Sequence, residues 1–170
     1  MHGGRFLASG LTTGDPNLRQ LHPPASARKL VVRITVEAPL RPTEDEAKVR
    51  EAAHRFFPDG AVLHLPGRIV VESRDLRPLR TRVWELRIID TFRSRFLAGA
   101  AADGASATFR LSKQASLAGK VSFPPTLHAL GDIEVRVELE AGDPWRDVEA
   151  LAWWLCPETK DGEIVGPTLP

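Results

Sequence analysis

Arginine residues recur on one side of a helix that the sequence predicts between Pro78 and Ala98. Guanidinium groups match the geometry of phosphate oxygens, and an indole ring can stack on a base or on an arginine. This side of the helix therefore predicts contact with the backbone of RNA; the alternative is a solvated helix face whose arginines form ion pairs. The side chains on this side or at its margin are Arg77, Arg80, Trp84, Arg87 and Arg95.

A second group of donors lies where a predicted strand gives way to a short segment of small residues ending at Gly119. Exposed donors at such a position can contact a phosphate or a ribose 2′-hydroxyl. The alternative is a β-bulge or turn in which the glutamine ties down backbone groups. The four residues of this group are Arg110, Lys113, Gln114 and Lys120.

Catalytic and metal-binding motifs are not found in the sequence. It contains no nucleotide-binding glycine fingerprint, P-loop, nucleophile elbow or HExxH motif. His54 and His64 would supply only two ligands, whereas a metal site normally needs three or four. We therefore expect no enzyme, no cofactor and no bound metal.

The single cysteine and the hydropathy of the chain indicate where the protein works. Cys156 has no partner for an internal disulfide, so we expect a buried thiol in a reducing cytoplasm. No apolar stretch is long enough to span a bilayer, so no membrane partner is expected. Trp145, Trp153 and Trp154 occur beside apolar residues at helical spacing, which favours packing over base stacking.

Charge is distributed unevenly although the net charge is only +1. Residues 68–120 carry 11 lysines and arginines against 5 acidic residues, whereas residues 131–163 carry 3 against 10. The basic segment can form a local anion-attracting surface, or the two segments can neutralise each other in the fold.

The elements that must position these residues are strands and amphipathic helices in alternation. Apolar residues at every second position predict strands at 30–38, 61–65, 68–72, 105–111, 119–123 and 133–139. A capping box of Thr43 and Glu46 begins a first helix that ends before Pro58, and Asp143-Pro144 begins a C-terminal helix. The order βαββαβββ plus a C-terminal helix predicts an α+β fold, a mostly antiparallel sheet with two helices on one face.

Four segments also resemble the archaeal uncharacterised protein family 0201, or domain of unknown function 54. They are VEAPLRPTED at 36–45, LRIIDTFR at 86–93, FRLSKQASLAGKVSF at 109–123 and LGDIEV at 130–135. The resemblance implies a fold like that of the fifth large-subunit ribosomal protein and a role in RNA binding. It implies no reaction.

These observations lead to one predicted domain, at residues 29–156, between a flexible arm at 1–28 and a polar tail at 157–170. We expect a non-enzymatic protein that contacts RNA through backbone or shape recognition, linked to RNA processing or the ribosome. The alternative is a structural interaction module without a nucleic-acid role, in which the sheet or the C-terminal helix pairs with a protein partner or a second copy.

Overall fold

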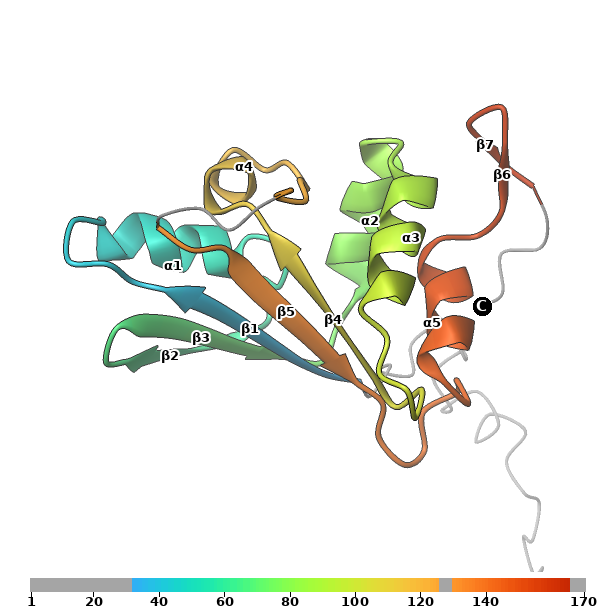
Figure 1. Ribbon diagram of the computed structural model, residues 1–170, viewed down its shortest axis with the longest axis horizontal. Coiled ribbons are helices and arrows are strands. Elements are labelled where there is room, and N and C mark those ends of the chain that lie inside the picture. Colours follow the sequence, from blue (N-terminus) through green and yellow to red (C-terminus); the bar gives the residue numbers. More distant parts are fainter. Residues whose placement is uncertain (1–31, 126–129, 166–170) are drawn as a thin grey trace, which may run out of the picture.

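The computed structural model describes residues 32–125 and 130–165, which form an α+β fold around a five-stranded sheet (Figure 1). The strands are β1 (Arg33–Pro39), β2 (Ala61–Leu65), β3 (Arg68–Ser73), β4 (Ser106–Leu111) and β5 (Ile133–Glu138). They lie in the order β2-β3-β1-β5-β4, and every neighbouring pair is antiparallel. The predicted fold class is confirmed.

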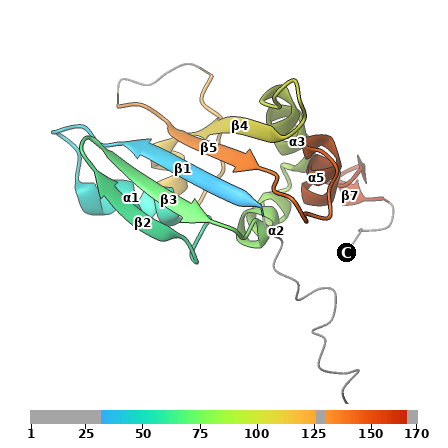
Figure 2. The same ribbon diagram turned by 90° about the horizontal axis from the view of Figure 1, so that it is seen from below.

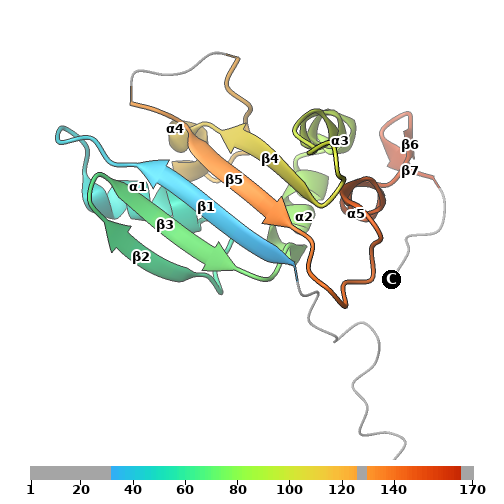
Figure 3. The same cartoon turned by 60° about the horizontal axis from the view of Figure 1, so that its bottom comes forward.

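The helices gather against one face and one end of this sheet. They are α1 (Glu46–His54), α2 (Arg77–Glu85), α3 (Ile89–Ala98), α4 (Lys113–Leu117) and α5 (Val148–Leu155). Figures 2 and 3 show the sheet in front of α1, and Figure 3 also shows α2 behind the sheet. Among the described elements, no helix lies across the other face, which we call the open face.

Period-two alternation assigns each strand residue to the helix-covered face or to the open face. In β1, Ile34, Val36 and Ala38 are buried, while the residues between them are exposed or half-buried. The same pattern continues in β5, where Val135 and Val137 are fully buried, as predicted. The strand register places the following residues on the open face: Arg33, Thr35, Glu37, Ala61, Leu63, Leu65, Arg68, Val70, Glu72, Ser106, Thr108, Arg110, Glu134, Arg136 and Glu138.

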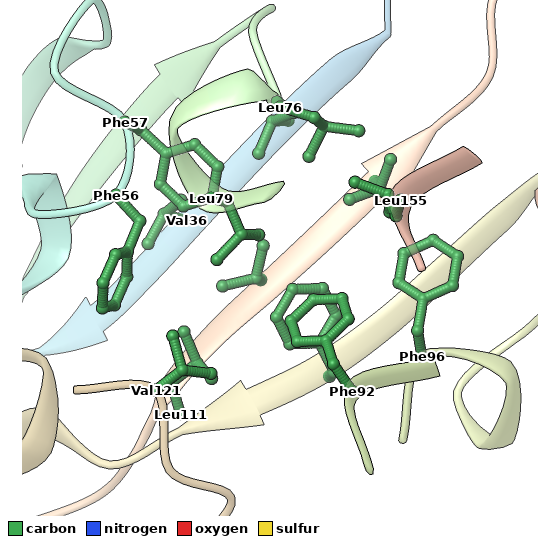
Figure 4. Close-up of a cluster of buried hydrophobic side chains, with 14 of the residues drawn as sticks. Val36, Phe56, Phe57, Leu76, Leu79, Phe92, Phe96, Leu111, Val121 and Leu155 are labelled. Carbon is green, nitrogen blue, oxygen red and sulfur yellow. The ribbon is translucent and has the colours of Figure 1, made fainter. Parts of the chain in front are cut away.

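Aromatic side chains from the helices fill the space above the covered face (Figure 4). Phe56 and Phe57 follow the end of α1, and Phe92 and Phe96 come from α3. The ring of Phe92 meets that of Phe109 on β4 edge to face, with centroids 5.2 Å apart. Such pairs stabilise a core beyond the apolar area they bury.

The predicted helix from Pro78 to Ala98 is wrong as a single helix, because the chain forms two. α2 ends where the Leu86 N–H donates to the Arg82 carbonyl, and Arg87 then adopts a left-handed backbone with φ 54°. A left-handed residue cannot continue a right-handed helix. The turn at Arg87 brings α3 against α2, β4 and α5 (Figure 1).

Two predicted helix starts are also wrong. Asp45, not Thr43, caps α1, because its Oδ1 accepts from the N–H groups of Ala47 and Lys48. The C-terminal helix begins at Val148 rather than after Asp143, and Asp147 is its cap. An aspartate next to the first turn competes successfully for the free amides in both cases.

The segment from residue 112 to residue 125, directly after β4, differs from its prediction. Lys113 and Gln114 begin the short helix α4, capped by Ser112, instead of standing in a turn or bulge. The predicted strand at 119–123 is not part of the sheet. The Ser112 N–H does donate to the Ser122 carbonyl, and Val121 is buried, so its alternation reflects burial beside α4.

The ends of the chain are described only in part. The predicted arm at 1–28 lies outside the described residues. Within the predicted tail, β6 (Thr159–Lys160) and β7 (Glu163–Ile164) form a small antiparallel hairpin. The division into arm, domain and tail stays a prediction.

Candidate functional site

Arg80 and Trp84 point into the fold and hold α5. The Arg80 guanidinium lies between two indole rings, 4.3 Å from the centroid of Trp84 and 4.5 Å from that of Trp154. Its Nε donates to the Trp154 carbonyl at 2.9 Å, and Trp84 Nε1 donates to the Leu155 carbonyl at 2.8 Å. Burial lowers the pKa of Arg80 from its usual value. These two side chains therefore join α2 to α5.

Replacing Arg80 with alanine should lower the free energy of unfolding by about 2–3 kcal/mol, since it removes a charged hydrogen bond and two cation–π contacts. Urea denaturation measures this loss. Arg50 is an exposed arginine on α1, and its replacement with alanine should change stability by less than about 0.5 kcal/mol. Equal effects of the two substitutions would contradict an internal role for Arg80.

Lys113 is also used inside the fold. Its side chain is 9% exposed and pairs at 3.0 Å with Glu44, whose side chain is 10% exposed. Lys113 Nζ also donates to the carbonyls of Pro39 and, at 2.7 Å, Leu130. The ammonium group thereby joins α4 to the end of β1 and the start of the β5 segment. Gln114, the next residue, is exposed.

Arg77 lies at the other end of the sheet, where charges of both signs meet. Its Nε and Nη2 donate to the Asp75 carboxylate, each at 2.8 Å, and the pair lowers the pKa of Asp75. Both residues line a hollow of about 860 Å³ that also contains charged residues of both signs: Arg33, Asp59, Glu72, Arg74 and Glu138. The hollow carries no excess of positive charge.

The remaining predicted cations are exposed, but they lie on different elements. Arg87 stands at the α2–α3 corner and Lys120 follows α4. Arg95, on α3, lies 6.0 Å from the Phe123 ring centroid. Arg110 faces the open side of the sheet, where its register partner is Glu134. The structure does not gather the nine predicted residues on one surface.

Two arginines that sequence reasoning missed do converge. Arg55, directly after α1, and Arg82, on α2, both reach Gly119, the residue before Lys120. A Cβ atom placed on Gly119 would lie 3.1 Å from Arg55 Nη2 and 3.6 Å from Arg82 Nη2. They line a hollow of about 490 Å³, which we call the arginine hollow; its lining residues are Arg55, Phe56, Pro78, Thr81, Arg82, Glu85 and Gly119.

In the arginine hollow, the protein partners of Arg55 and Arg82 leave some of their N–H donors free. Arg82 Nε donates to the Gly119 carbonyl at 2.7 Å, and its Nη1 donates to Glu85 at 2.9 Å. Within residues 32–125 and 130–165, the one ion pair of Arg55 is a long one with Glu51, at 3.6 Å, and its side chain is 42% exposed. Each guanidinium has five N–H donors, so both retain donors for an oxyanion. Gly119 has φ 75°, so a side chain there would be strained and would crowd Arg55.

Sequence reasoning missed this hollow because its parts are far apart in the chain. Arg82 is only two residues from Arg80 and therefore points to a different side of α2. Arg55 follows α1 and carries no motif. The one signal was Gly119, which ends the small-residue segment beside the predicted donors Lys113, Gln114 and Lys120.

Other reactive side chains are used structurally. His54 Nε2 lies 3.2 Å from the Gly60 carbonyl, and His64 Nδ1 pairs with Glu46 at 2.8 Å. Within 32–125 and 130–165, no group of three or more His, Cys, Asp or Glu residues could hold a metal. Cys156 is buried as predicted, and burial raises its pKa to about 12, so its thiol stays protonated at neutral pH. The helices of the described chain are too short or too polar to cross a membrane.

Archaeal proteins of similar sequence cover almost the same span. The chain is 35% identical over 153 residues to the UPF0201 protein of Methanopyrus kandleri, covering 80% of this chain and 91% of that protein. It is 36% identical over 140 residues to the UPF0201 protein of Metallosphaera sedula, covering 78% and 92%. The chain belongs to the UPF0201 family. No family model matches the sequence.

Solved structures of UPF0201 proteins show the same fold. That of the Methanococcus jannaschii UPF0201 protein superposes with a TM-score of 0.70 at 24% identity, covering 79% of this chain and 99% of that one. Another UPF0201 protein superposes with a TM-score of 0.67 at 29% identity, covering 78% and 99%. The predicted family resemblance is therefore confirmed. The family name specifies no activity, so the side chains are the basis for a proposed function.

Proposed function

We propose that this UPF0201 protein binds RNA through the sugar–phosphate backbone, with Arg55 and Arg82 as the central phosphate contacts. The observation that carries the proposal is their convergence on Gly119 inside the arginine hollow. Two guanidinium groups aimed at one point suit an oxyanion, because each offers a planar fork of donors. The hydroxyl of Thr81 lines the same hollow and can add a neutral donor.

Exposed cations outside the hollow extend this contact. Lys120 adjoins Gly119 and is exposed, and Arg87 is exposed at the end of α2. Contacts of this kind position a nucleic acid without reading its sequence. Trp84, the predicted stacking residue, is instead committed to α5, which agrees with backbone rather than base recognition. Arg80 and Lys113 form bonds inside the fold and are not among the proposed RNA contacts.

A structural role competes with this proposal. Arginines often bind carbonyls near the end of a helix, and Arg82 binds the carbonyl of Gly119, two residues after the last residue of α4. This role explains the Nε of Arg82 but leaves Arg55 unexplained, since in the described part of the chain Arg55 has only its long pair with Glu51. Arg55 is therefore the residue that separates binding from capping.

Substitution of Arg55 with glutamine should weaken binding of a structured RNA and reduce its salt dependence. One lost phosphate contact should lower the slope of log K against log salt by roughly 0.7–0.9. Fluorescence anisotropy with a labelled RNA hairpin over a series of salt concentrations measures this slope. The thermal midpoint should change little, because exposed ion pairs contribute at most about 1 kcal/mol.

Arg50→Gln is the matched control, since it removes the same charge from an exposed position of α1 outside the hollow. It should leave the slope within error of the wild type. Equal losses of RNA affinity for Arg50→Gln and Arg55→Gln would mean that the effect comes from net charge alone. A wild-type protein that binds neither structured nor single-stranded RNA at low salt would contradict the proposal and favour an interaction module without a nucleic-acid role.

A further inference from the structure

The two edges of the sheet are finished differently. The outer edge of β4 is covered by the chain that follows α3: Thr108 N–H donates to the Gly99 carbonyl at 2.9 Å, and Ala101 N–H donates to the Ser106 carbonyl at 2.8 Å. Packing there is so close that a Cβ on Gly99 would lie 1.7 Å from the Thr108 carbonyl oxygen. β2, at the other edge, has β3 as its single strand neighbour in the described sheet (Figure 3).

β2 also lacks the features that usually protect an edge strand. Such strands commonly carry lysine, an inward-pointing charge, proline or a bulge, which prevent another strand from pairing. The sequence of β2 is Ala-Val-Leu-His-Leu, and all five residues pair with β3 without interruption. His64 is the only titratable residue, and it is turned toward Glu46 of α1.

Two large apolar side chains are exposed along this edge. Leu63 and Leu65 are 42% and 39% exposed and lie on the open face. Leu63 is paired with Val70 of β3, which is only 7% exposed although it also faces the open side. The three side chains form an apolar strip beside a backbone edge with which no other described strand pairs. Burial of such a strip and pairing of the edge would stabilise an added strand.

We infer that β2 pairs antiparallel with β2 of a second copy of this chain, joining the two sheets across a two-fold axis at Leu63. The strand is complementary to itself in this register: Leu63 meets Leu63 of the partner, and each Leu65 meets the smaller Ala61. Val62 meets His64 on the helix side. No two like charges of β2 face each other in this register. Each open-face residue of one β2 lies opposite an open-face residue of the other, as the pleat of the strands requires.

Exposed charges beside β2 also permit a second copy. The accessible residues of α1 carry both signs: Glu46, Lys48, Arg50 and Glu51. Arg68 and Glu72, which flank the apolar strip on β3, likewise differ in sign. A two-fold contact places the same patch on both partners, so a patch of mixed sign avoids strong repulsion. The inference is independent of RNA binding, because β2 contributes no residue to the arginine hollow.

The first test is the mass of the protein in solution by light scattering. The wild type should approach twice its chain mass of 18.7 kDa as its concentration rises, and Leu63→Lys should remain at 18.7 kDa with an unchanged circular dichroism spectrum. Val165→Lys is the control, since Val165 is an exposed apolar residue, 39% accessible, outside β2. It should dimerise like the wild type. A wild type that stays monomeric at every concentration overturns the inference.

Disulfide trapping tests the register itself. Directly opposite residues of an antiparallel pair have Cα atoms about 4.5–5.5 Å apart, which suits a disulfide. Leu63→Cys should therefore cross-link into a dimer under mild oxidation. In the same register the two copies of residue 65 are about 14 Å apart, since four residues of strand rise about 3.4 Å each, so Leu65→Cys should not cross-link. Equal cross-linking of both variants would indicate random collision and overturn the assigned pairing.

Discussion

Replacing Val135 with aspartate should destabilise the protein by several kcal/mol and leave little folded material at room temperature. Val135 is fully buried in β5, between Val36 of β1 and Phe109 of β4. A carboxylate at this point would have no cation to pair with and would lose its hydration, and an unpaired buried charge is among the most destabilising changes known. Most domains have only about 5–15 kcal/mol of stability to lose.

Arg136→Asp is the control for this prediction. It introduces the same residue one position further along β5, where the side chain is exposed on the open face. It removes an exposed ion pair with Glu138 at 3.2 Å, so the loss should stay near about 1 kcal/mol. Circular dichroism melting curves of the two variants measure the contrast. Similar midpoints for both would show that the two faces of β5 are wrongly assigned.

The sheet was predictable because its sequence signal is local. A strand with one buried face must alternate every second residue, and β1, β4 and β5 each do so over six or seven residues. The predicted strands 61–65 and 68–72 left only Pro66 and Gly67 between them, and Gly67 takes the positive φ that such a tight turn requires. Strand order, by contrast, depends on pairings between distant segments, such as β1 with β5.

The helix break at Arg87 had no local signal. Leu79, Val83, Leu86, Ile89, Phe92 and Phe96 keep an uninterrupted helical spacing across it. No glycine or proline marks the turn, and arginine rarely adopts positive φ. The break lets α3 pack against β4 and α5 while Leu79 and Val83 of α2 are buried in the core, which is a tertiary requirement. The predicted grouping of arginines on one side assumed a single helix, so these arginines do not share one helix side in the structure.

The number of cations can be read from the sequence, but their positions in the fold cannot. The sequence shows an excess of cations between residues 68 and 120, yet it cannot show which of them the fold uses internally. Arg80 is enclosed by tryptophans contributed partly by α5, and Arg93 donates to the carbonyls of Cys156 and Pro157. The C-terminal half therefore binds Arg80 and Arg93 through backbone carbonyls, whereas Arg74 pairs with the carboxylate of Glu140.

Lys113 is the clearest case of a predicted contact residue that the fold uses for itself, and its replacement with methionine should cost about 3–5 kcal/mol. Methionine preserves the length and apolar stem of lysine but removes the ammonium group. Glu44 would then be a nearly buried carboxylate without its cation, and the carbonyls of Pro39 and Leu130 would lose a donor. Unpaired buried groups of this kind account for most of the expected loss.

Two further variants separate this explanation from a general loss of packing. Lys120→Met removes an exposed ammonium group from the same segment and should change the free energy of unfolding by less than about 0.5 kcal/mol. Glu44→Gln in the Lys113→Met background removes the uncompensated carboxylate. It should recover at least about 1 kcal/mol of the loss, because contacting residues in one ion pair are coupled in a double-mutant cycle. Additive losses in urea denaturation would mean that Lys113 and Glu44 do not stabilise each other, and they would return Lys113 to the set of residues available to a ligand.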